Sequence, residues 1–188
     1  MSKIENNPAT NKMRGMLGGT IVYRQVNNVT ICSTRPKKRD KPTEHQIKTK
    51  GKFLKAVEYA KQQMALPEMK ALYQKAVNSR IPNAYTAALK DFLNAPTVME
   101  VRTSEYNGQA GSRLSCIVHD DFEVMAVKME IFDQTGRLLE SGYAEKMDLQ
   151  ADGWEYKATV ANPTATGSRI VITGTDRPGN AGVKEVVL

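Results

Sequence analysis

Hydrophobic and polar positions change their period twice along the chain, and the first pattern is that of paired strands. Residues 20–26 and 29–34 are rich in β-branched side chains, and the intervening Asn27-Asn28 pair tolerates the positive φ of a tight turn. The pattern predicts a β-hairpin over residues 20–34. Because an isolated hairpin is marginal in water, we expect it to pack on the helices that follow or on the sheet edge of another subunit.

Helical spacing replaces alternation after residue 42. Thr43 and Gln46 have the spacing of a capping box, which predicts that a helix opens here and ends at Leu66-Pro67. The positions that repeat at helical spacing are Ile47, Lys50, Leu54, Val57, Lys61 and Met64, and Phe53 and Ala60 widen the apolar stripe. A second helix is predicted from Pro67 to about residue 77 and a third over residues 84–93. These three helices would make a small bundle or clasp.

Alternation returns after residue 96, with turn residues every 8 to 14 positions. The seven candidate strands are residues 98–106, 112–119, 124–133, 138–147, 154–160, 169–175 and 183–188. This spacing predicts an immunoglobulin-like β-sandwich of about seven strands, with Trp154 in its core. A second cysteine is missing from this half, so an inter-sheet disulfide of the antibody type is excluded.

The predicted fold class is therefore α+β in two parts: an N-terminal hairpin with short helices, and a C-terminal all-β sandwich. The expected divisions are a flexible tail over residues 1–12, the hairpin and a basic extended segment over 13–42, helices over 43–96, and the sandwich over 97–188.

Charge is distributed unevenly between these parts. The chain carries +7 overall, but residues 1–97 hold 18 Lys and Arg against 6 Asp and Glu, a net charge of +12. Residues 98–188 hold 9 against 14, a net charge of −5. A concentrated positive field attracts polyanions or acidic protein faces, and the opposite signs would let neighbouring copies attract each other.

The strongest chemical signal is a basic segment, residues 35–42, followed by lysines on the first helix. Its prolines at 36 and 42 favour an extended path. The candidate partner-binding residues are Arg35, Lys37, Lys38, Arg39, Lys41, Lys48, Lys52 and Lys55. They could contact nucleic-acid phosphates or acidic protein surfaces, or they could form a solvated face without a partner. All three interpretations stay open, although no aromatic platform interleaves the lysines. In the hairpin, the candidate assembly residues are Ile21, Tyr23, Arg24 and Ile31.

Patterns of catalysis, cofactor binding or metal binding are missing from the sequence. His45 and His119 have no Ser, Cys or acid in triad-like spacing, and phosphate-cradling loops and zinc motifs do not occur. Asp120, Asp121 and Glu123 resemble weak Ca²⁺ ligands, but acids beside a β-turn usually stabilise the turn itself. We therefore expect no enzyme activity, cofactor, metal or small-molecule substrate, and we expect Cys32 and Cys116 to be buried free thiols.

Membrane and export signals are missing too. No apolar run approaches the ~20 residues that span a bilayer, and the first dozen residues do not resemble a signal peptide. We expect a soluble protein located in a virion or in the cytoplasm of a bacterial host, without membrane partners.

One part of the sequence resembles a family of poorly characterised phage and gut-bacterial proteins. The pattern is a glycine-led hairpin over residues 18–36, followed by Pro42-Thr43-Glu44-His45-Gln46 and Lys52-Phe53. The likeness covers about residues 15–60 and implies a structural role in a virion. In the C-terminal half, residues 131–136 and 174–180 are similar to Ig-like modules that decorate bacterial surface and phage proteins.

Three hypotheses follow. The leading one is a non-enzymatic phage-like virion structural or accessory protein, in the head or the tail, that binds itself or other virion proteins through the hairpin and the basic segment. The second is a cytoplasmic nucleic-acid-binding protein that uses its basic half. The third is an adhesion module that binds a glycan or a host surface through the loops of the sandwich.

Overall fold

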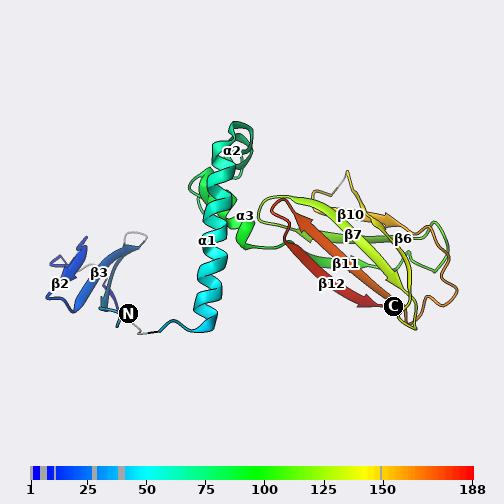
Figure 1. Ribbon diagram of the computed structural model, residues 1–188, viewed down its shortest axis with the longest axis horizontal. Helices are drawn as coiled ribbons and strands as arrows, with labels where there is room; N and C mark the ends of the chain where they lie inside the picture. Colours follow the sequence, from blue (N-terminus) through cyan, green and yellow to red (C-terminus); the bar gives the residue numbers. More distant parts are fainter. Residues whose placement is uncertain (1, 5–7, 11, 27–28, 38–40, 149) are drawn as a thin grey trace. The chain divides into compact units, whose positions relative to one another are not determined.

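A computed structural model describes residues 2–4, 8–10, 12–26, 29–37, 41–148 and 150–188 (Figure 1). The chain divides into two compact units, Met1–Ile47 and Lys48–Leu188, which we call the N-terminal unit and the main unit. The described residues form three helices and three antiparallel sheets. None of the described helices has the length and apolar character needed to cross a bilayer.

The N-terminal unit is built on a four-stranded sheet in the order β1-β4-β3-β2. Its strands are β1 (Ser2–Ile4), β2 (Gly15–Leu17), β3 (Ile21–Val26) and β4 (Val29–Thr34). The predicted hairpin is confirmed as β3 paired with β4, and its Asn27-Asn28 turn lies outside the described residues. A second turn joins β2 to β3, where Gly18 and Gly19 both adopt positive φ, a conformation that suits glycine.

Strand β1 differs from the expectation of a flexible tail over residues 1–12. Ser2–Ile4 pairs antiparallel with β4, from Ser2 opposite Cys32 to Ile4 opposite Thr30. The outer edge of the hairpin offers unpaired backbone donors and acceptors, and a short polar segment can satisfy them without burying apolar side chains.

The three helices follow the predicted pattern. Helix α1 (Glu44–Ala65) opens with the capping box: Thr43 N–H donates to Gln46 Oε1 at 3.0 Å, and Gln46 N–H donates to Thr43 Oγ1 at 3.3 Å. Helix α2 (Pro67–Gln74) has proline in its first turn, and α3 (Ala84–Leu93) is capped by Asn83. They share a small core centred on Ala60, Tyr73, Ile81, Ala84, Ala87 and Ala88.

Two four-stranded antiparallel sheets form the rest of the main unit. One has the order β5-β6-β10-β9 and the other β12-β11-β7-β8. Their strands are β5 (Thr97–Arg102), β6 (Arg113–His119), β7 (Val124–Phe132), β8 (Leu138–Tyr143), β9 (Glu145–Lys146), β10 (Gly153–Lys157), β11 (Arg169–Asp176) and β12 (Ala181–Val187). Alternate residues of both sheets point into one shared core, which includes Leu114, Met129, Ile131, Trp154, Ile170 and Ile172.

The predicted fourth strand, residues 138–147, is two strands in the structure. Strand β8 pairs with β7 in one sheet, whereas β9 pairs with β10 in the other. The change takes place at buried Ala144, whose N–H donates to the carbonyl of Val127 at 2.8 Å. Two sheets of four strands therefore replace the expected seven strands.

The expected boundary at residues 96–97 does not separate the helices from the sheets, because both belong to the main unit. The Asn180 side-chain amide, in the β11–β12 turn, donates to the carbonyls of Asp91 and Phe92 at 3.2 Å. The Phe122 ring lies against Tyr73, with ring centroids 4.4 Å apart. The change of period at residue 96 marks a change from helices to strands, and these contacts join the helices to the sandwich.

Candidate assembly interface

The N-terminal sheet has almost no interior of its own. Among its described residues only Thr30 is buried, and its hydroxyl accepts a 2.6 Å hydrogen bond from the Gln25 side chain. The predicted assembly residues Ile21, Tyr23 and Ile31 are partly buried, and Arg24 is exposed opposite Ile31. The sheet is therefore held mainly by backbone pairing, which alone gives little net stability.

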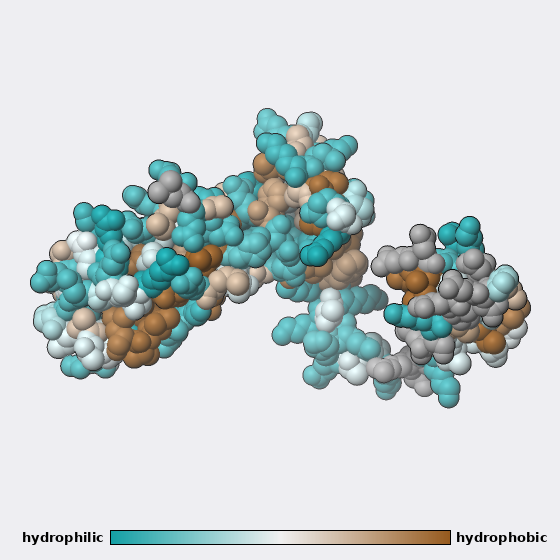
Figure 2. All heavy atoms as spheres, turned by 180° about the vertical axis from the view of Figure 1, so that it is seen from behind, coloured by the Kyte–Doolittle hydropathy of each residue, from teal (hydrophilic) through white to brown (hydrophobic). Residues whose placement is uncertain are grey.

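Several apolar side chains of this sheet are exposed to solvent, two of them in the edge strand β2. In β2, Met16 and Leu17 are each 55% exposed, and Met13 and Val26 are also exposed. Strand β2 pairs on one side only, with β3, so it is an edge strand. Figure 2 shows apolar surface on this sheet among hydrophilic residues. An exposed apolar edge strand is a site at which another chain can pair.

The first half of α1 also presents apolar residues that the main unit does not bury. Ile47 and Leu54 are each 57% exposed and Phe53 is 48% exposed, whereas Ala56 and Ala60 are fully buried. The predicted apolar stripe is thus covered only toward its C-terminal end, where Tyr59 and Met64 pack on the helical core.

The basic residues lie beside these apolar positions in the sequence. Arg35, Lys37 and Lys41 are exposed, and Lys38 and Arg39 lie outside the described residues. Lys48, Lys52 and Lys55 are exposed on α1, at spacings that place them on one helix face.

Lys52 has a partner of its own, because its ammonium donates to the carbonyl of Leu93 at 2.8 Å. That contact holds α1 to the C-terminal end of α3. In the described part of the chain, Arg35, Lys37, Lys41, Lys48 and Lys55 have no ion-pair partner. Their charges are thus free to meet an external anion.

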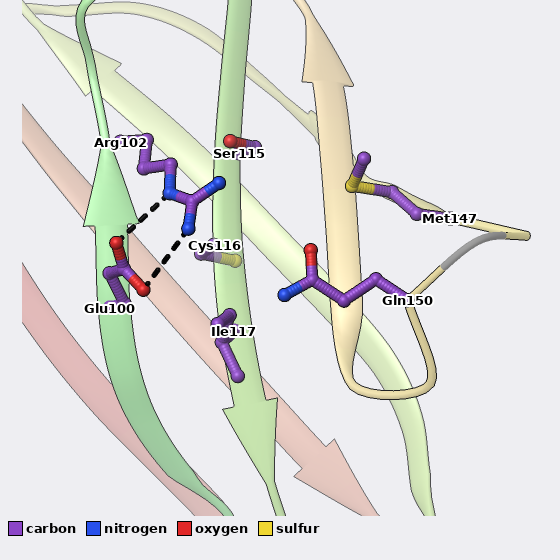
Figure 3. A pocket seen from close by; sticks show the side chains of 7 residues that line it. All are labelled: Glu100, Arg102, Ser115, Cys116, Ile117, Met147 and Gln150. Atoms are coloured by element: carbon purple, nitrogen blue, oxygen red, sulfur yellow. Dashed lines mark hydrogen bonds and ion pairs between the residues drawn. The ribbon is translucent and has the colours of Figure 1, made fainter.

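Hollows in the sandwich do not resemble a catalytic centre. The cavity in Figure 3 holds about 20 Å³, enough for roughly one water, and its Glu100 and Arg102 form an ion pair at 2.9 Å. Cys116 lines it, and burial raises the pKa of this thiol to about 12. A larger hollow, of about 430 Å³, is open to solvent beside the exposed Tyr143. The adhesion hypothesis would use such a hollow, and it stays a prediction.

The two histidines of the chain are both exposed. His45 is exposed in the first turn of α1. His119 Nδ1 lies 3.0 Å from Asp152 Oδ2 in an exposed pair between β6 and the residue before β10. The expectation that the chain is not an enzyme stays a prediction.

Comparison with known proteins gives no family. No family model matches the chain, and no curated protein sequence matches it. Among solved structures, the chain is similar to CopC from Methylosinus trichosporium OB3b, with 14% identity, a TM-score of 0.36, and coverage of 48% of this chain and 87% of CopC. It is also similar to the catalytic module of the pneumococcal glycogen-degrading virulence factor SpuA, with 13% identity, a TM-score of 0.28, and coverage of 43% and 13%.

Proposed function

We propose that this chain is a non-enzymatic structural protein that assembles with further copies of itself, as a structural or accessory component of a phage-type virion. The observation that carries the proposal is the N-terminal sheet, which has one buried described residue and an apolar edge strand. Side chains such as Met16 and Leu17 gain about 1.5–3 kcal/mol each when a partner removes them from water.

The distribution of charge favours a second copy of this chain as the partner. Residues 1–97 carry +12, and their exposed cations lack ion-pair partners within the described chain. The sandwich has the opposite sign, and its Glu105, Glu145 and Asp148 are exposed without an ion pair among the described residues. One copy's basic surface therefore complements the acidic surface of another.

The phage part of the proposal is supported by the sequence pattern over residues 15–60. We infer further that the sandwich is of the immunoglobulin type. The order β5-β6-β10-β9 matches strands A-B-E-D of that fold, and β12-β11-β7-β8 matches G-F-C-C′. Such a module leaves its loops at the two ends of the sandwich, where further contacts can be made.

Sedimentation velocity over a range of protein concentrations tests the proposal. We expect the wild-type protein to associate as its concentration rises, and we expect Leu17→Glu to weaken association at least tenfold, because it places a charge in the apolar edge. Leu138→Glu is the matched control, since Leu138 is 46% exposed on the sandwich. A wild-type protein that stays monomeric at high concentration, or equal effects of both variants, contradicts self-assembly through this sheet.

Nucleic-acid binding is a second candidate, favoured by the unpaired cations Lys48 and Lys55 on one face of α1. Phosphate binding of this kind releases counterions, so affinity falls with a slope of about −0.9 per phosphate on logarithmic axes. Fluorescence anisotropy with labelled duplex DNA at several salt concentrations measures that slope. A K48E/K55E double variant should reduce the salt dependence of the affinity. If the wild-type protein shows no salt-sensitive binding to DNA, this function is rejected.

A further inference from the structure

Three aspartates from distant parts of the sequence converge where the helices of the main unit meet the sandwich. Asp91 lies in α3, Asp120 in the turn between β6 and β7, and Asp176 at the end of β11. One carboxylate oxygen from each can be chosen so that all three lie within 4.8 Å of one another. This spacing is short enough for three ligands of a single ion.

Two of these carboxylates have a buried oxygen that accepts no hydrogen bond from any residue the structure describes. Asp91 is 0% exposed; its Oδ2 accepts from the Tyr73 hydroxyl at 2.5 Å, and its Oδ1 has no donor. Asp120 Oδ2 accepts from the backbone N–H groups of Phe122 and Glu123, and its Oδ1 is buried without a donor. Buried carboxylate oxygens normally have partners, and each of these two oxygens keeps an unused acceptor position.

Positive charge within the fold does not balance the cluster. Arg177, the adjoining cation, donates from Nη2 to Glu123 at 2.6 Å, and its Nε has no partner. Burial raises the pKa of Asp91 to about 7, and Asp120 and Asp176 add to the rise by repulsion. Burial likewise raises the pKa of Asp176. The fold therefore brings three acids together, and burial disfavours the charged forms of Asp91 and Asp176.

We propose that Asp91, Asp120 and Asp176 bind a hard divalent cation of the Ca²⁺ class. The cluster offers carboxylate oxygens only, with neither Cys nor His among its members, which suits Ca²⁺ and disfavours Zn²⁺. A cation there would join α3 to the two turns of the sandwich, next to the bonds that Asn180 makes with the end of α3.

The sequence pointed to a different trio, Asp120, Asp121 and Glu123, and led to the expectation of no metal. In the structure Asp121 binds Lys90 at 3.2 Å and the Asn94 side chain, and Glu123 binds Arg177. Only Asp120 joins the cluster. The proposal is independent of self-assembly, because all three ligands belong to the main unit of one chain.

The test is thermal unfolding of the full-length protein after removal of bound metal with a chelator. Addition of about 1 mM CaCl₂ should raise the unfolding temperature by about 5–10 °C, the shift expected at roughly a hundredfold excess over Kd for a chain of this size. Asp91→Asn and Asp120→Asn should each abolish this shift. Asp121→Asn removes the same charge from the same turn but leaves the cluster intact, so it should keep the shift.

Tb³⁺ provides a second readout that does not depend on stability. A Tb³⁺ ion bound at Asp91 lies close to Tyr73, so excitation of tyrosine should give Tb³⁺ luminescence that CaCl₂ displaces. Asp120→Asn, at the less buried position, keeps the test valid if Asp91→Asn does not fold. The proposal is overturned if neither Ca²⁺ nor Mg²⁺ raises the unfolding temperature of the wild-type protein. That result is expected if the three acids merely share a proton. The proposal is also overturned if Asp120→Asn shows the same Ca²⁺-dependent rise in unfolding temperature as the wild type, or if Asp121→Asn loses that rise.

Discussion

Replacement of Gly182 by alanine tests whether the helices and the sandwich form one cooperative unit. Gly182 lies in β12, and a methyl group at its Cα would overlap the carbonyl oxygen and carbon of Pro96, just before β5. Because both groups are backbone, neither can rotate away, and β12 or the segment before β5 must move. Overpacking of this kind costs about 1–3 kcal/mol.

The displacement would also disturb Asn180, two residues earlier, whose amide donates to carbonyls at the end of α3. Each such hydrogen bond contributes about 0.5–1.5 kcal/mol net. We therefore expect Gly182→Ala to lower the free energy of unfolding by about 3 kcal/mol, combining the overlap with the loss of one or two bonds.

Gly51→Ala is the matched control, because it makes the same chemical change where nothing lies within 4 Å of the new methyl group. Gly51 lies in α1, where alanine is the better helix former by about 1 kcal/mol. The control should therefore stabilise the protein by about that amount. The two variants are expected to move the unfolding free energy in opposite directions.

Urea unfolding followed by two probes gives both values. Trp154, the only tryptophan of the chain, lies in the sandwich core and reports through fluorescence, whereas circular dichroism at 222 nm reports mainly on the helices. The two midpoints should coincide in the wild type and shift together in Gly182→Ala. The idea that helices and sandwich form one cooperative unit would be refuted if the two probes gave different urea midpoints in the wild type. It would also be refuted if Gly182→Ala lowered the free energy of unfolding by less than about 1 kcal/mol.

Three further predictions concern single side chains. Glu140 is buried in β8, and its Oε2 accepts from the Tyr156 and Thr159 hydroxyls and two backbone N–H groups. Glu140→Ala should therefore lower the free energy of unfolding in urea by about 3 kcal/mol. A loss below about 1 kcal/mol would show that water replaces the carboxylate. Burial raises the pKa of Cys116 to about 12, whereas Cys32 is partly exposed. Mass spectrometry after iodoacetamide treatment at pH 8 should therefore find Cys32 modified first. Equal rates of modification at the two cysteines would contradict this prediction. Asn83 caps α3 through its Oδ1, so Asn83→Ala should lower thermal stability by about 1 kcal/mol, whereas Asn83→Ser should keep most of it.

Much of the local structure was predictable because it depends on neighbouring residues. The capping box at Thr43, the bounds of α3 and the pairing of β3 with β4 each follow from a short pattern. Strands β1 and β2 were not predicted, since three residues are too few for a period. The sheet change at Ala144 was also missed, because residues 138–147 contain no proline and no Asn-Gly or Asp-Gly pair to mark a break between two strands.

The candidate sites were harder to predict because they depend on distant contacts. The basic residues can be read from the sequence. The sequence does not show that Lys52 donates to the carbonyl of Leu93, or that the apolar stripe on α1 is covered at one end. The aspartate cluster joins positions 91, 120 and 176, so no local spacing reveals it. A lone Asp among the apolar residues of α3 was the one available signal, because a buried carboxylate needs compensation.

Hydrogen exchange measured at increasing protein concentration tests most directly whether the N-terminal sheet depends on another copy. Peptides from residues 15–34 should be weakly protected in dilute protein and gain at least tenfold protection as the concentration rises. Peptides from β7 and β11, in the sandwich core, should be equally protected throughout. Protection of residues 15–34 that is the same at every concentration would contradict a sheet stabilised by assembly.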